Sequence, residues 1–91
     1  MLGITVTNEL INNFILLNGQ DMYINIVHAL YGPQKLRCVL QTLFDGERIG
    51  FIVDGNEKFV KMDELLNMTV GENECHIKSD VMEIYMKTTN I

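Results

Sequence analysis

Between residues 35 and 62, three apolar-rich runs are separated by two Asp-Gly pairs. The runs cover residues 35–44, 47–53 and 56–62, and polar and apolar positions tend to alternate along them. Alternation is typical of a β-strand, because successive side chains of a strand point to opposite faces. Asp-Gly is favoured where the central residues of a hairpin turn need positive φ. The pattern therefore predicts a three-stranded antiparallel meander.

The faces of these three strands differ in polarity. In residues 35–44 one face is the better core candidate, and it carries Leu36, Cys38, Leu40, Thr42 and Phe44. Gly50 lies inside the second strand, where a glycine indicates a bulge or a close approach of the backbone. Charged residues stand on both faces of the third strand, so we expect this strand at a sheet edge.

The chain before the meander is harder to interpret. Residues 1–6 read as a short strand. In residues 8–18 the apolar spacing is helical, Thr7 is a suitable N-cap and Asn18-Gly19 a suitable stop, although a strand entering a hairpin is the alternative. Residues 22–31 fit a helix that Gly32-Pro33 would end, but their β-branched and aromatic residues favour a strand followed by a turn at residues 32–34.

After the meander, residues 63–68 resemble one helical turn begun by acidic residues, and residues 74–78 and 81–88 form a hairpin around Ser79-Asp80. The 91 residues are expected to form a single small domain, residues 1–91. The predicted fold is α+β and mostly β. We expect a five- to six-stranded antiparallel meander, as a strongly twisted sheet or a partly open small barrel, with one N-terminal helix.

Composition narrows the function classes. Twelve acidic and seven basic residues give a net charge of −5, which disfavours nucleic-acid binding because such binding neutralises phosphates with several cations. No apolar run approaches the roughly 20 residues that a membrane-spanning helix needs. No Lys or Arg precedes Lys35, so a secretory signal is not expected either. We expect a cytoplasmic protein that does not insert into a membrane.

No motif indicates catalysis, a cofactor or a metal. Cys75 and His76 are neighbours in a predicted strand, so their side chains point to opposite faces and do not form one site. Cys38 and His28 fit a core or rim position, and the two Cys and two His lack zinc-ligand spacing. The glycines fit hairpins and do not form a phosphate-binding loop. We expect a protein that is not an enzyme and that binds no cofactor or metal.

The first 34 residues contain only two charged side chains, Glu9 and Asp21. This segment is either ordinary core or in part an interface, since interface cores lose charge and gain aromatic residues and Met. The candidate interface residues are Phe14, Leu17, Met22, Tyr23, Ile26, Tyr31, Met82 and Met86. They predict a protein-binding or accessory module that is homo-oligomeric, such as a small inhibitor or regulator of bacterial or phage type.

A second hypothesis comes from a resemblance. A helix followed by Phe14-Ile15-Leu16-Leu17-Asn18-Gly19-Gln20 and a bent sheet resembles the opening of Sm-like RNA-binding barrels. The spacing of the later strands departs from that family's pattern, and its nucleotide-contacting motifs are not evident. The resemblance implies a ring oligomer that binds RNA through a basic patch, for which this chain offers Lys35, Arg37, Arg48, Lys58 and Lys61.

Overall fold

The computed structural model describes residues 7–53 and 55–89, which form one α-helix, one 3-10 turn and eight strands. The predicted class, α+β and mostly β, is confirmed, and every strand pairing is antiparallel. The predicted strand at residues 1–6 lies outside the described residues. The elements are α1 (Asn8–Ile15), β1 (Asp21–His28), β2 (Gly32–Val39), β3 (Gln41–Phe44), β4 (Arg48–Val53), β5 (Asn56–Lys61), the 3-10 turn η1 (Met62–Glu64), β6 (Leu65–Val70), β7 (Glu74–Ser79) and β8 (Met82–Thr88).

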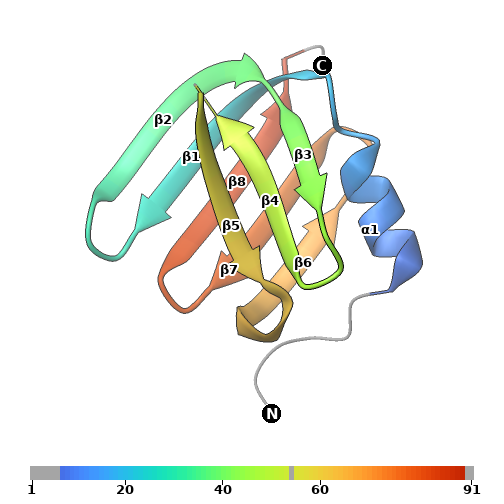
Figure 1. The fold of residues 1–91 in the computed structure, drawn as a ribbon. Helices are drawn as coiled ribbons and strands as arrows, with labels where there is room; N and C mark the ends of the chain where they lie inside the picture. Colours follow the sequence, from blue (N-terminus) through green and yellow to red (C-terminus); the bar gives the residue numbers. More distant parts are fainter. Residues whose placement is uncertain (1–6, 54, 90–91) are drawn as a thin grey trace.

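The strands form two sheets that face one another (Figure 1). Five strands have the order β2-β1-β8-β7-β6, and three have the order β3-β4-β5. In Figure 1 the three-stranded sheet crosses in front of the five-stranded sheet, and α1 lies at the side of both. β8 sits between β1 and β7, so the larger sheet is not the simple meander that we predicted.

The predicted meander is confirmed in the smaller sheet, where β3, β4 and β5 pair in chain order. Its first strand is shorter than predicted, because residues 35–44 break at Leu40 and supply both β2 and β3. Leu40 is fully buried, and its backbone N–H and carbonyl bond to Gln20 and Gly19, each at 2.8 Å. Its hydrogen bonds therefore go to the loop after α1, and the chain passes from one sheet to the other here.

The glycines of the two Asp-Gly pairs both lie in turns, with φ of +92° at Gly46 and +79° at Gly55. The first turn has three residues between its strands and is closed by Asp45. The Asp45 carboxylate accepts hydrogen bonds from the backbone N–H of Glu47 and Arg48, at 3.1 and 2.9 Å. This arrangement is an Asx-type turn, in which the aspartate side chain replaces a backbone acceptor.

The helix prediction and the strand prediction for the early segments are confirmed. Thr7 caps α1 by accepting a hydrogen bond from the Leu10 N–H at 3.1 Å. Residues 21–28 form β1, but the turn to β2 lies at residues 29–31, earlier than predicted, and Pro33 belongs to β2.

The helical turn predicted at residues 63–68 is wrong beyond Glu64. Residues 65–70 form β6, which pairs with β7 and buries Leu65 and Met68. The register shifts between Leu65 and Asn67, so the spacing of three between the buried residues comes from a β-bulge and not from a helix.

The core fills the space between the two sheets and α1. Its largest fully buried side chains are Phe14, Phe51, Leu17, Met22, Ile24, Leu40, Ile49, Leu65, Ile77, Ile84 and Met86. Within the part of the chain that the structure describes, the three-stranded sheet and α1 cover only one face of the five-stranded sheet, and the other face is open. No helix within residues 7–53 and 55–89 has the length and apolar character needed to cross a membrane.

Candidate functional site: the outer face of the five-stranded sheet

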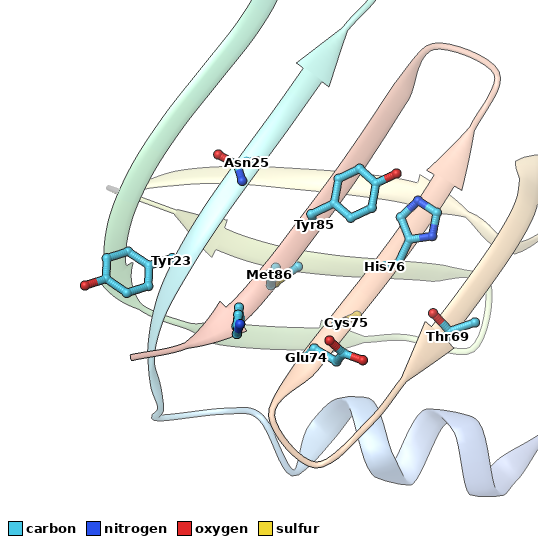
Figure 2. Close-up of a pocket in the computed structure, with 9 residues that line it drawn as sticks. Tyr23, Asn25, Thr69, Glu74, Cys75, His76, Tyr85 and Met86 are labelled. Carbon is cyan, nitrogen blue, oxygen red and sulfur yellow. The ribbon is translucent and has the colours of Figure 1, made fainter. Parts of the chain in front are cut away.

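We use the name outer sheet face for the side chains that alternate with the core residues along β2, β1, β8, β7 and β6. Cross-strand pairing arranges them in three rows. The first row is Arg37, Tyr23, Lys87 and Glu74; the middle row is Lys35, Asn25, Tyr85, His76 and Thr69; the third row is Pro33, Val27, Glu83, Lys78 and Asn67. A hollow of about 420 Å³ lies on this face (Figure 2).

Two rings at the centre of the face are stacked. The rings of His76 on β7 and Tyr85 on β8 have centroids 4.3 Å apart and planes inclined by 9°, and Figure 2 shows them side by side. The Tyr85 hydroxyl donates a hydrogen bond of 2.7 Å to Glu83, which lowers the pKa of that carboxyl and raises the pKa of Tyr85. The Glu83 carboxylate thus helps to orient the Tyr85 ring, and the stacked Tyr85 and His76 rings form an aromatic surface at the centre of the face.

The His76 ring also approaches Glu83. Its Nε2 lies 3.7 Å from a carboxylate oxygen of Glu83, and this buried atom has no hydrogen-bond partner among the described residues. The distance is too long for a hydrogen bond. The neighbouring Cys75 thiol is buried, and burial raises its pKa to about 12. The Cys75 thiol is therefore not activated as a nucleophile.

A second aromatic ring lies nearer the β2 edge. Tyr23 on β1 is 52% exposed, and the guanidinium carbon of Arg37 lies 5.6 Å from its ring centroid. Arg37 is held there by Asp21, whose carboxylate accepts hydrogen bonds from Nε at 3.0 Å and Nη2 at 2.8 Å. These bonds lower the pKa of Asp21 and raise that of Arg37. The hydrogen bonds to Asp21 thus hold the Arg37 guanidinium beside the exposed Tyr23 ring.

The outer sheet face differs in charge from the rest of the chain. It carries four of the seven basic residues and, with Asp21 at its border, three of the twelve acidic residues. The face thus has one surplus positive charge, whereas the other residues of the chain carry a surplus of six negative charges. The face is mixed in charge, and it is set apart from an otherwise acidic molecule.

The candidate interface residues fall into two groups. The buried group packs in the chain's own core and consists of Phe14, Leu17, Met22, Ile26, Met82 and Met86. Much of the charge-poor start is therefore accounted for as core, which was the alternative interpretation. Tyr23 and Tyr31 are accessible, and Tyr31 is 83% exposed in the turn after β1. Tyr23 and the buried Met86 both line the hollow on the outer sheet face, and Tyr23 is the accessible one of the two.

The five candidate RNA-binding cations do not form one patch. Lys35 and Arg37 lie on the outer sheet face. Arg48 and Lys61 are paired on the far side of the smaller sheet, where the Arg48 guanidinium stacks 4.4 Å from the centroid of Phe59. Lys58 is half-buried opposite Phe51. The strand order separates the two pairs, because it places β2 and β4 in different sheets.

The sequence interpretation missed several residues of the site. The prediction placed Tyr85, His76, Lys78 and Lys87 in a hairpin, but it did not assign them to a site. The alternation along residues 81–88 was visible and placed Glu83, Tyr85 and Lys87 on one face. The missing information was the pairing of β8 with β1, which brings Tyr85 next to Asn25 and Lys87 next to Tyr23.

Within the described residues, no group of three or more His, Cys, Asp and Glu side chains is placed to hold a metal ion. Comparison with protein-family models, with curated proteins and with solved structures found no match to this chain.

Proposed function

We propose that this chain is a non-catalytic protein-binding module that contacts its partner through the outer sheet face. The observation that carries the proposal is the pair Tyr23 and Tyr85, which are 52% and 46% exposed on adjacent central strands. Tyrosine and arginine are enriched among the residues that dominate binding energy, and here Arg37 lies over the Tyr23 ring. A regular sheet face is not expected to leave two large rings and a hollow in water without a use.

The rigidity of the platform supports the proposal. β1 and β8 are each paired on both sides, so the backbone under the two tyrosines is fixed by two ladders of hydrogen bonds. Hydrogen bonds to Asp21 and Glu83 orient Arg37 and Tyr85 in advance. Preorganised side chains lose less conformational entropy on association, which favours affinity.

The test is site-specific photo-crosslinking in the native host. A benzoylphenylalanine introduced in place of Tyr23 should form adducts with a protein partner upon irradiation. The matched control carries the same group in place of Glu57, an exposed residue on the far side of the three-stranded sheet. Adducts at position 23 and not at position 57 support the proposal. Equal labelling at both positions, or none at position 23, contradicts it.

A second candidate function is binding of single-stranded RNA by the same face. The observation that favours it is that Tyr23, Tyr85 and His76 provide ring surfaces for stacking, while Lys35 and Arg37 stand beside them. Stacking platforms flanked by cations are typical of such sites. The single surplus positive charge of the face makes this the weaker candidate. A labelled RNA oligonucleotide would have to bind, with affinity that falls steeply as salt rises.

We also propose a cytoplasmic location. Cys38 and Cys75 are both free thiols in the structure. A reducing compartment keeps such thiols from forming disulfides between chains. Mass spectrometry of protein alkylated during lysis of the native host tests this proposal. Complete alkylation of the accessible thiol is expected, and a disulfide-linked dimer in the lysate would contradict it.

A further inference from the structure

Four charges on β7 and β8 form a square on the outer sheet face. Glu74 pairs across the strands with Lys87, and Lys78 pairs with Glu83. The sign of the charge also changes along each strand. On β7, Glu74 and Lys78 lie on either side of His76, and on β8, Glu83 and Lys87 lie on either side of Tyr85. Every charge in the square therefore has a neighbour of opposite sign both across and along the sheet.

This arrangement is complementary to itself. Consider a second copy placed face to face with the first and related by a two-fold axis that runs along the middle row, across the strands. The first and third rows then exchange places, and the middle row faces itself. Lys87 of one copy meets Glu83 of the second copy, and Glu74 meets Lys78 of the second copy. Each of these contacts occurs twice, as it must in an interface with two-fold symmetry.

The apolar residues of the face fit the same operation. Tyr23 in the first row meets Val27 of the second copy in the third row, and these two are 52% and 50% exposed in one chain. Tyr85 meets its own counterpart near the axis. The interface would then have an aromatic centre surrounded by ion pairs, which is the anatomy of protein interfaces. Lys35 in the middle row faces its counterpart at the β2 edge, and this is the one like-charge contact that the operation produces among the three rows.

The size of the face is sufficient. Five strands about 4.8 Å apart, with about six residues each at ~3.3 Å, give a face of roughly 24 by 20 Å. Two copies would bury about 1,000 Å² between them in projection, which is near the lower limit for a specific interface. We therefore infer that the partner of the outer sheet face is a second copy of this chain, docked about a two-fold axis along the middle row. The inference rests on the proposed function and names the partner and its symmetry.

The test uses pairs of charge-reversal variants. Each variant should dimerise poorly with itself, and the two variants of a pair should dimerise well with each other. In Lys87→Glu, position 87 faces Glu83 of an identical copy, so two like-charge contacts form. In Glu83→Lys, position 83 faces Lys87 in the same way. When the two variants are mixed, both contacts join opposite charges. We expect light scattering to give twice the chain mass of 10.4 kDa for the wild type. Each variant alone should lose at least tenfold in dimer affinity, and the equimolar mixture should recover the wild-type value.

Glu83 is also the acceptor for Tyr85, so a second pair guards against a local effect of that substitution. Glu74→Lys and Lys78→Glu replace exposed residues and should show the same loss alone and recovery when mixed. A reversal on the smaller sheet, Glu57→Lys, is the matched control and should leave the mass unchanged. Circular dichroism confirms that each variant is folded before its mass is interpreted.

Three outcomes would overturn the inference. One is a wild-type mass of a single chain at a protein concentration of roughly 100 μM, because a dimer with a dissociation constant below that concentration would be largely assembled. Another is a failure of both mixtures to recover. The third is recovery in the mixture of Lys87→Glu with Glu74→Lys, which indicates an axis parallel to the strands. A monomeric wild type that still crosslinks to another protein through position 23 would overturn the second copy as partner and leave the proposed function standing.

Discussion

Gly50→Ala tests the packing on the far side of the smaller sheet. Gly50 on β4 pairs with Phe59 on β5, and a Cβ added at position 50 would lie 2.5 Å from Cδ1 and 2.6 Å from Cε1 of the Phe59 ring. The close approach predicted at Gly50 from the sequence is thus made by a side chain that lies over it. An alanine here must push the ring away, which also separates Phe59 from the Arg48 guanidinium stacked on it.

The expected cost follows from the covering of that ring. Phe59 is 37% exposed, so about 100 Å² of its side chain is covered, and uncovering half of that costs about 1–1.5 kcal/mol. Loss of the cation–π contact adds about 0.5 kcal/mol. The lower backbone entropy of an unfolded alanine returns about 0.5–1 kcal/mol. We therefore expect Gly50→Ala to destabilise the fold by about 1 kcal/mol.

The assay is a double-mutant cycle with Phe59→Ala, followed by urea unfolding and far-UV circular dichroism. In the Phe59→Ala background the ring is gone, although the Lys58 carbonyl oxygen remains 3.2 Å from the added Cβ. Gly50→Ala should therefore cost clearly less in this background than in the wild type, and the coupling should be about 1–2 kcal/mol. In the wild-type background the midpoint should fall by about 1 M urea or less. Gly71→Ala is the control, because its nearest atom is the flexible Glu74 side chain at 3.4 Å. An equal effect of Gly50→Ala in both backgrounds would refute the packing argument.

Two further predictions concern the thiols and the dependence on acid. Cys75 is buried and its pKa is raised to about 12, so a thiol reagent at pH 8 should modify Cys38 in the native protein and reach Cys75 only in denaturant. Equally fast reactions of the two thiols in the native protein would contradict this prediction. Hydrogen bonds lower the pKa values of Asp21, Asp45 and Glu83, so the native state binds fewer protons than the unfolded chain near their ordinary values of 3.8 and 4.5. This contribution to stability is present above the ordinary pKa values and is lost as the pH falls through the lowered pKa values of the folded protein. The urea midpoint should therefore decrease from pH 6 to pH 3. A midpoint that does not change over this range would argue against the three contacts.

Local signals in the sequence were sufficient to predict most helices, strands and turns, but they did not predict how the strands are arranged in two sheets. Thr7 and the apolar spacing after it identified α1, and the glycines at 46 and 55 identified two turns. The break at Leu40 could not be seen, since alternation continues through it and only the loop that binds its backbone reveals the corner. β6 was missed because a β-bulge imitates helical spacing.

The candidate site could not be predicted from the sequence of any single strand, because it depends on which face of the sheet another sheet covers. Tyr23 was identified because it belongs to a charge-poor segment, yet its neighbours on that segment are core residues. Alternation separates Met22 from Tyr23 correctly, but it does not say which face a second sheet will cover. That choice is made by the packing of β3, β4 and β5 against one side, and it decided which half of each strand became the open platform.

The central place of β8 has a consequence for how the chain folds. Of the eight strands, β8 comes last along the chain, and it fits between β7, which immediately precedes it, and β1, which is the first strand. Until it emerges from the ribosome, the β1–β2 and β6–β7 hairpins cannot join, and each has an unpaired edge where β8 belongs. Sheets that depend on such distant pairings fold slowly. The nascent chain should therefore keep these two hairpins separate, and it should be most prone to aggregation while β8 is still missing from between them.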